Sequence, residues 1–275
     1  GSQYDSYSNL DSFGKEEYTK LIKMCEKNRI EFMSTPFDEE SVDMLISIGM
    51  KGFKIASCDI NNFPLLEYIA RKKKPILLST GASNLSEIKK AVKLIERNGN
   101  NKIVIMHCIL CYPTAPEDSN LGALVDLKRS FPKYLIGLSD HTLGTMVASS
   151  SVLLGSRVIE KHFTFDKKLP ISADHWLSLD EEDLTKLILD IRFMEKVFGQ
   201  EKKERLICEE QAFLYARRSI VAKFDIEKGE KIKLNMLEMK RPGTGIPPNL
   251  LRKVVNKKAK NFISKDQIIS YKDII

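Results

Sequence analysis

Residues 75–107 read PILLSTGASNLSEIKKAVKLIERNGNNKIVIMH, and this stretch decides the fold class. Each of its ends is a short apolar run, as expected for a buried strand. Its middle repeats apolar residues at helical spacing, namely Ile88, Val92 and Ile95. Asn84 or Ser83 is suited to cap the start of this helix. The spacing predicts a helix over 85–97 between two strands, which is a parallel β/α unit.

The same alternation runs along the chain outside this stretch. Six candidate strands lie between helical segments, at 31–34, 52–55, 75–79, 102–107, 135–139 and 157–162. Each ends in a small or polar cluster, which is typical of the reaction face of a barrel. We therefore expect an α/β fold of the (β/α)8 TIM-barrel type. A doubly wound open sheet is the main alternative, but its glycine-rich first turn is absent.

The length of the β/α region bears on the completeness of the barrel. An eight-unit barrel typically needs about 250 residues, whereas here the pattern changes character near Ile207. We expect the first two units to be missing from a barrel domain over 3–206, either because the natural chain extends upstream or because the barrel is incomplete. Short strands and turns predict a second, smaller domain over 216–275.

Composition narrows the class of protein. The chain has 275 residues, 43% hydrophobic and 29% charged, which excludes intrinsic disorder. Its apolar runs are too short to cross a bilayer and no leader opens the chain, so no membrane partner is expected. Five cysteines without the spacing of a zinc ribbon or a secreted scaffold favour the cytoplasm. The net charge of +7 is dispersed, which favours small anionic substrates over nucleic acid.

Two histidines, His141 and His162, lie at the ends of successive predicted strands. Paired imidazoles can hold a divalent ion such as Mn²⁺, Co²⁺ or Zn²⁺, with water and substrate oxygens completing the shell. A single histidine at such a place is more often a hydrogen-bonded rim residue, but two favour a metal site. His107 and His175 are interpreted as structural residues.

A lysine inside an apolar strand, Lys54, requires an anion or a carboxylate as partner. It could simply pair with Asp59 or reach outward to solvent. Hydroxyl groups at neighbouring strand ends would supply hydrogen-bond donors beside its charge, from Ser57, Ser79 and Ser139. This combination is what a phosphate group requires.

The loops contribute further candidates. Asp59 and Asp174 could orient sugar hydroxyls or assist proton transfer, although loop aspartates more often form caps and turns. Tyr112 begins a Tyr-Pro-Thr sequence that could form a substrate wall. Arg241 lies in the glycine-braced segment 240–245, where it could clamp an anionic or polyhydroxyl ligand. For both of the last two, a simple turn is the alternative.

These residues resemble the sialic acid (nonulosonic acid) synthase family. The matching stretches run in family order and are FMSTPF (32–37), FKIAS (53–57), LSTG (78–81), HC (107–108), YPT (112–114), GLSDHT (137–142), EKHFT (160–164), ADH (173–175) and KRPGTG (240–245). The resemblance implies a phosphoenolpyruvate-dependent condensing barrel followed by an antifreeze-like (SAF) domain. It also implies a homodimer in which the small domain of one subunit covers the barrel of the other.

The resemblance also implies roles for the candidates. The metal ligands would be His141 and His162, with Mn²⁺ expected first and Mg²⁺ or Co²⁺ as alternatives. The phosphoenolpyruvate contacts would be Lys54, Ser57, Ser79 and Ser139. The contacts to an N-acylated hexosamine would be Asp59, Tyr112, Asp174 and, from the partner subunit, Arg241. The implied catalytic set is Lys54, Asp59, His141, His162 and Asp174. In the implied reaction the enol carbon attacks the sugar aldehyde, water adds and phosphate leaves, giving a nine-carbon acid.

The chain also departs from the family pattern. The family's first strands carry Glu-Ile-Gly and Lys-x-Gln motifs that have no counterpart here, and Asp59 stands where a glutamate is usual. A non-catalytic ligand-binding or assembly protein of the same fold is therefore a second hypothesis. Leu110 replaces a common asparagine, and the approach to Asp174 is altered. The acceptor could thus be N-acetylmannosamine or a di-N-acetylated bacterial sugar.

Overall fold

The chain is described by a computed structural model, which defines residues 13–170 and 174–275. It divides into two compact units, 1–199 and 200–275. Within the two described ranges, no helix combines the length and the apolar character needed to cross a bilayer.

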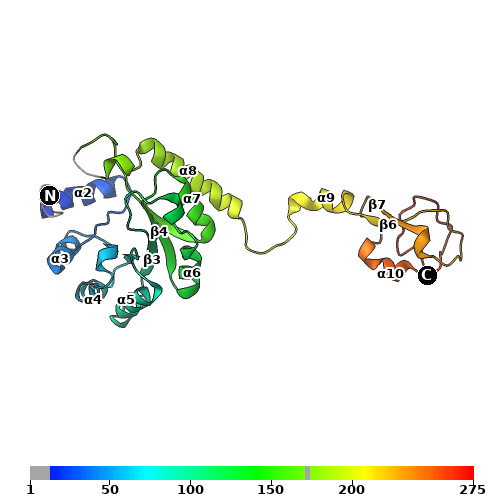
Figure 1. Ribbon diagram of the computed structural model, residues 1–275, viewed down its shortest axis with the longest axis horizontal. Helices are drawn as coiled ribbons and strands as arrows, with labels where there is room; N and C mark the ends of the chain where they lie inside the picture. Colours follow the sequence, from blue (N-terminus) through cyan, green and yellow to red (C-terminus); the bar gives the residue numbers. More distant parts are fainter. Residues whose placement is uncertain (1–12, 171–173) are drawn as a thin grey trace. The chain divides into compact units, whose positions relative to one another are not determined.

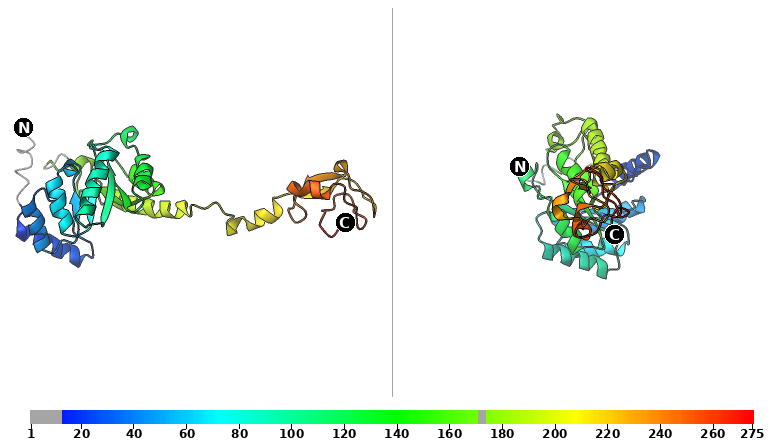
Figure 2. Two further views of the ribbon diagram at one scale, coloured as in Figure 1. Left: turned by 90° about the horizontal axis from the view of Figure 1, so that it is seen from below. Right: turned by 90° about the vertical axis from the view of Figure 1, so that its right-hand side faces the viewer.

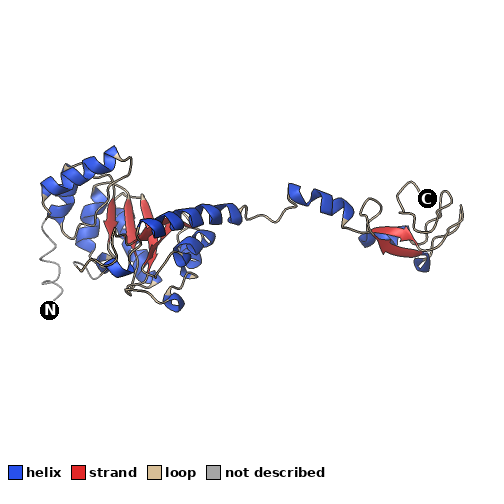
Figure 3. Ribbon diagram, turned by 90° about the horizontal axis from the view of Figure 1, so that it is seen from above, coloured by secondary structure: helices blue, strands red, loops and turns tan. Residues whose placement is uncertain are grey.

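Unit 1 contains a five-stranded parallel sheet whose strand order follows the chain (Figures 1 and 3). Its strands are β1 (Phe53–Ile55), β2 (Ile76–Ser79), β3 (Ile103–Cys108), β4 (Leu135–Asp140) and β5 (Ser156–Lys161). The order does not reverse, which excludes the doubly wound alternative for this sheet. The expected parallel α/β class is confirmed. Closure into eight strands stays a prediction, because β1 and β5 are the edges of the described sheet.

The expected strand at 31–34 is wrong as a full strand. Only Ser34 pairs with Phe53, through an isolated parallel bridge, and Lys54 N–H donates to the Ser34 carbonyl at 3.2 Å. This segment lies outside β1, where the described residues offer a partner on one side only. One bridge is too little to hold a regular strand there.

Helices follow one another around the outside of the sheet (Figures 1 and 2). They are α2 (Lys15–Lys27), α3 (Glu39–Ser47), α4 (Phe63–Arg71), α5 (Leu85–Arg97), α6 (Ala123–Ser130), α7 (Met146–Ser151) and α8 (Glu181–Phe198). The predicted helix over 85–97 is confirmed. Asn84 accepts from the N–H of Ser86 and of Glu87, and the Glu87 carboxylate accepts from the Asn84 N–H at 2.8 Å. This reciprocal cap fixes where α5 begins.

The main core fills the space between the sheet and these helices. Fully buried residues of β1 and β2, such as Phe53, Ile76 and Leu78, pack with Val92 and Ile95 of α5. Burying an aliphatic side chain of this size stabilises a fold by about 1.5–3 kcal/mol. The strands are therefore anchored along their length, and their carboxyl ends hold fixed positions.

Short 3₁₀ turns connect several of these elements in both units. They are η1 (Ser57–Asp59), η2 (Pro116–Asp118), η3 (Val152–Leu154), η4 (His175–Leu177), η5 (Ile207–Glu209), η6 (Leu234–Met236) and η7 (Pro248–Leu250).

Unit 2 is built around an antiparallel pair, β6 (Ser219–Ala222) and β7 (Leu237–Lys240), with the short helices α9 (Glu210–Tyr215) and α10 (Leu251–Val254). The other expected short strands form isolated bridges instead, such as Ile226 with Ile263 and Val221 with Ile268. Ile220, Ile226 and Ile263 are each fully buried and belong to the core of this unit. The unit therefore has its own core.

Candidate active site

Strand register in unit 1 places several candidate residues on one face of the sheet. Lys54 pairs with Leu77 two residues before Ser79, and Ser79 pairs with Met106. Met106 pairs with Gly137, two residues before Ser139 on β4, and Ser139 pairs with Glu160. Side chains alternate along a strand, so this register puts four of them on the same face: Lys54, Ser79, Ser139 and Glu160. His141 and His162 follow Ser139 and Glu160 by two residues, just past the ends of β4 and β5.

The ammonium group of Lys54 is held by groups from β1 and β5. Its side chain is 14% exposed, and its Nζ lies 3.4 Å from Glu160 Oε1 and 3.3 Å from the Ile55 carbonyl. The same Glu160 oxygen accepts a hydrogen bond from Ser139 Oγ at 2.9 Å. The Glu160 carboxylate therefore holds the Lys54 ammonium and the Ser139 hydroxyl group close to the same oxygen atom.

Sequence reasoning missed Glu160, and it placed Lys54 beside Asp59 as the simple alternative. The available signal was a pair of charged residues, Glu160 and Lys161, within a run otherwise typical of a buried strand. A carboxylate at such a position needs a partner, and strand alternation from Ser139 would have suggested it.

Two serine hydroxyls behave differently at this face. Ser57 Oγ accepts from the Gly81 N–H at 2.9 Å, which joins the turn after β1 to the turn after β2. Ser79 is 1% exposed, and its Oγ is the one buried side-chain oxygen or nitrogen within 13–170 and 174–275 that lacks a hydrogen-bond partner. Leaving a buried hydroxyl unsatisfied costs about 1–3 kcal/mol. Such a group is suited to a ligand.

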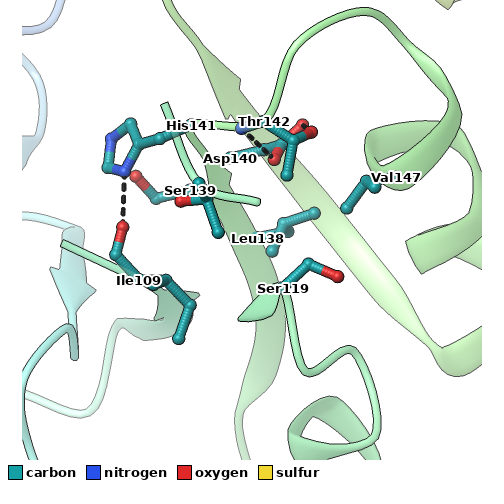
Figure 4. A pocket seen from close by; sticks show the side chains of 9 residues that line it. Ile109, Ser119, Leu138, Ser139, Asp140, His141, Thr142 and Val147 are labelled. Carbon is teal, nitrogen blue, oxygen red and sulfur yellow. Dashed lines mark hydrogen bonds between the residues drawn. The ribbon is translucent and has the colours of Figure 1, made fainter. Parts of the chain in front are cut away.

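The two imidazoles predicted to bind metal lie side by side. The ring centroids of His141 and His162 are 5.3 Å apart. His141 Nδ1 lies 2.7 Å from the Ile109 carbonyl (Figure 4). Because a carbonyl only accepts, the proton of a neutral His141 is on Nδ1 and the lone pair is on Nε2. Its ring is thus oriented as metal-binding imidazoles usually are, with the other nitrogen bonded to a carbonyl.

These two imidazoles fit a divalent ion that keeps open positions. In the described ranges, no group of three or more His, Cys, Asp or Glu side chains is arranged to hold a metal. Two nitrogen ligands would leave the remaining positions to water and substrate oxygens, as a Lewis-acid site requires. The residues that would hold the ion are His141 and His162.

Tyr112 and Asp174 border the imidazole pair. The Tyr112 ring centroid lies 4.0 Å from that of His141 and 5.8 Å from that of His162. Asp174 Oδ2 lies 3.8 Å from His162 Nδ1. The structure therefore brings both residues to the imidazole side of the site.

Asp59 and Arg241, two other predicted site residues, differ from these in their surroundings. Asp59 accepts from Asn62 Nδ2 at 3.0 Å and from the neighbouring Cys58 thiol, both in its own turn, which matches the turn-forming alternative. Arg241 follows β7 in unit 2 and is exposed, so its link to the site stays a prediction. The residues interpreted as structural bind locally: His107 Nε2 meets the Ser119 carbonyl at 3.0 Å and His175 Nδ1 meets Thr164 Oγ1 at 2.9 Å.

A buried thiol, Cys108, also lies in the site and was not among the predicted residues. Burial alone would raise the pKa of this thiol. Hydrogen bonding with His141 and Ser57 opposes that effect and leaves the pKa below its ordinary value. Register pairs Cys108 with Ser139, so the thiol faces the same side as the other site residues.

The sequence of each unit matches a known family. Residues 1–203 match the NeuB family and residues 217–275 match the SAF domain. An uncharacterized protein of Methanocaldococcus jannaschii is 43% identical over 99% of this chain and 80% of its own length. The N,N'-diacetyllegionaminic acid synthase of Legionella pneumophila is 37% identical over 99% of this chain and 77% of its own.

A solved structure extends the likeness to three dimensions. The N-acetylneuraminic acid (sialic acid) synthetase of Leptospira borgpetersenii is 33% identical over 75% of both chains, with a TM-score of 0.70. The family match covers well over half of the chain, and it coincides with unit 1, which carries the site. The chain therefore belongs to the NeuB family of acid synthases and carries a SAF domain after its β/α unit.

Proposed function

We propose that this protein condenses phosphoenolpyruvate with an N-acylated hexosamine to give a nine-carbon nonulosonic acid and phosphate. The observation that carries the proposal is the buried, unpartnered Ser79 hydroxyl on the same face as the Lys54 ammonium. A phosphate oxygen would satisfy that hydroxyl and pair with the ammonium. Ser57, just after β1, and Ser139, near the end of β4, supply further hydroxyl groups.

The residues on the two sides of the site divide the work. Lys54, Ser79 and Ser139 would bind and orient phosphoenolpyruvate, while Tyr112 and Asp174 would hold the sugar beside the imidazoles. A bound divalent ion, with Mn²⁺ expected first and Mg²⁺ or Co²⁺ as alternatives, would supply Lewis-acid polarisation of the sugar aldehyde. The methylene carbon of phosphoenolpyruvate would form the new carbon–carbon bond to the aldehyde carbon. Water would add to the neighbouring carbon, which carries the phosphate, and the carbon–oxygen bond from that carbon to phosphate would break.

The acceptor is proposed to be a di-N-acetylated hexosamine, with N-acetylmannosamine as the competitor. Similarity to the Legionella synthase supports this choice. The human relative named N-acetylneuraminate-9-phosphate synthase is 31% identical over 98% of this chain. A panel containing both acceptors decides between them.

The decisive experiment measures phosphate release by the full chain with phosphoenolpyruvate, Mn²⁺ and that panel. We expect the wild type to release phosphate with one acceptor and the Lys54→Met variant to release none. Losing a hydrogen bond to a charged group costs about 1.5–3 kcal/mol, so phosphoenolpyruvate should bind at least about tenfold more weakly. Lys51→Met is the matched control, because Lys51 pairs with Glu31 at the surface three residues away.

Each outcome has a defined meaning. Binding of phosphoenolpyruvate without phosphate release from any acceptor would favour the non-catalytic binding protein instead. Failure to bind phosphoenolpyruvate at all, with Mn²⁺ present, would refute both the proposed reaction and the assignment of Lys54 and Ser79.

A further inference from the structure

A buried ion pair lies behind the two imidazoles, on the opposite face of the sheet. Lys161 Nζ donates to Asp140 Oδ2 at 2.7 Å, and the two side chains are only 5% and 2% exposed. Register pairs Asp140 with Lys161, one residue after the pairing of Ser139 with Glu160. Since side chains alternate, this ion pair faces away from the proposed substrate site.

Both partners of this pair immediately precede an imidazole in the chain. Asp140 is followed by His141, and Lys161 is followed by His162. The ion pair therefore joins the two backbone segments that carry the rings at the point where the β4–β5 ladder ends. Beyond that point the strands no longer hold the segments together by regular hydrogen bonds.

Further hydrogen bonds connect the ion pair to Thr142, the residue that follows His141. Asp140 Oδ1 accepts from the Thr142 N–H at 2.9 Å (Figure 4), and Asp140 Oδ2 accepts from Thr142 Oγ1 at 3.1 Å. Lys161 Nζ also donates to the Thr142 carbonyl. On the other side, Thr114 N–H donates to the His141 carbonyl at 3.0 Å. The backbone of His141 is thus held from both flanks.

The energetics argue against stability as the reason for this pair. Removing two charges from water costs several kcal/mol per ion, and replacing a buried pair with apolar residues is often neutral or stabilising. A role in fixing geometry explains the pair better, because it sets the two strand ends in one register.

We propose that Asp140 and Lys161 are positioning residues that fix the separation and orientation of the His141 and His162 rings. The proposal rests on the proposed function only in so far as those rings bind metal. Neither residue would touch the substrate or the ion. Both would act through the backbone that connects them to the imidazoles.

Two measurements on the full chain test this proposal. The first records long-range ¹H–¹⁵N spectra of the four histidine rings, which report the tautomer of His141 without any metal. The second measures the dissociation constant for Mn²⁺ from the electron paramagnetic resonance signal of the free ion. The variants are Lys161→Met and Asp140→Asn, and Lys167→Met is the control, because Lys167 binds Asp180 and Asp183 in a more exposed position.

We expect Lys161→Met to remove the single-tautomer signature of His141 and to weaken Mn²⁺ binding about tenfold, the lower end of the effect of losing an outer partner. Asp140→Asn should act in the same direction and Lys167→Met should do neither. Wild-type ring spectra in both test variants would overturn the proposal. Failure of both to fold would also overturn it, by assigning the pair to stability. If the wild type binds no Mn²⁺, the metal part of the proposed function fails, while the ring spectra still decide the positioning role.

Discussion

Replacing Ser79 with alanine should stabilise the unliganded protein and weaken its binding of phosphoenolpyruvate. The Ser79 hydroxyl is 1% exposed and has no hydrogen-bond partner. An unsatisfied buried hydroxyl costs about 1–3 kcal/mol, and a small loss of packing offsets part of its removal. We expect a net gain of about 1 kcal/mol, or about 2–4 °C in the melting temperature of a unit of this size.

Bound phosphoenolpyruvate should reverse this order of stability and favour the wild type over Ser79→Ala. In the wild type a bound phosphate would satisfy the Ser79 hydroxyl, and a hydrogen bond to a charged group contributes about 1.5–3 kcal/mol. Ser79→Ala should therefore raise the dissociation constant for phosphoenolpyruvate at least about tenfold. Fluorescence of Trp176, the single tryptophan, reports unfolding of unit 1, and calorimetric titration measures the binding.

Ser151→Ala is the matched control for the stability measurement. Ser151 is fully buried like Ser79, but its Oγ donates to the Ala148 carbonyl at 2.6 Å. The same substitution there should lower stability by about 1 kcal/mol. A loss of stability in Ser79→Ala as large as that in Ser151→Ala would refute the reasoning, because the hydroxyl would then be satisfied without a ligand.

Two further substitutions test the turns and the thiol of the site. In Gly81→Ala the new methyl carbon would lie 2.8 Å from Leu110 Cγ and 2.9 Å from Ser57 Oγ. Both side chains must then shift, and calorimetry should show phosphoenolpyruvate binding about tenfold weaker. Unchanged binding would contradict the placement of this turn in the site. Burial raises the pKa of the Cys108 thiol, but its interactions with His141, Ser57 and Ser139 together more than offset that effect. The thiol should therefore ionise below the ordinary value of about 8.5. A thiol whose pKa is lower in the folded than in the unfolded state stabilises the fold fully at a pH above its unfolded-state pKa. This stabilisation is lost as the pH falls through the folded-state pKa. In a pH titration followed by thiolate absorbance at 240 nm, the step at the lowest pH should be absent from Cys108→Ser. It should remain in Cys58→Ser, because burial raises the pKa of the Cys58 thiol. The opposite pattern would contradict the assignment.

Local sequence signals predicted the elements that local physics determines. The helix over 85–97 begins where Asn84 and Glu87 cap each other, a bond pattern contained within four residues. The strand expected at 31–34 failed because a strand needs a neighbour as well as a suitable sequence, and only Ser34 finds one. Edge segments of this kind cannot be assigned from their own residues.

The candidate site was predictable where one rule applied, namely that parallel strands end on one face. That rule brought His141 and His162 together, as the 5.3 Å separation of their rings shows. It could not separate Asp59, which binds within its own turn, from a residue aimed at the site. It also missed Glu160 and Lys161, because their roles depend on which face of β5 each occupies.

The division of the site between strands has a consequence for engineering. The groups proposed to hold phosphate come largely from the ends of β1 and β2, whereas Tyr112 belongs to the connection after β3. That connection packs against the imidazole side through the contact of Tyr112 with His141. Transplanting residues 109–122 from a relative should therefore change which sugar is accepted and leave the donor half of the reaction intact.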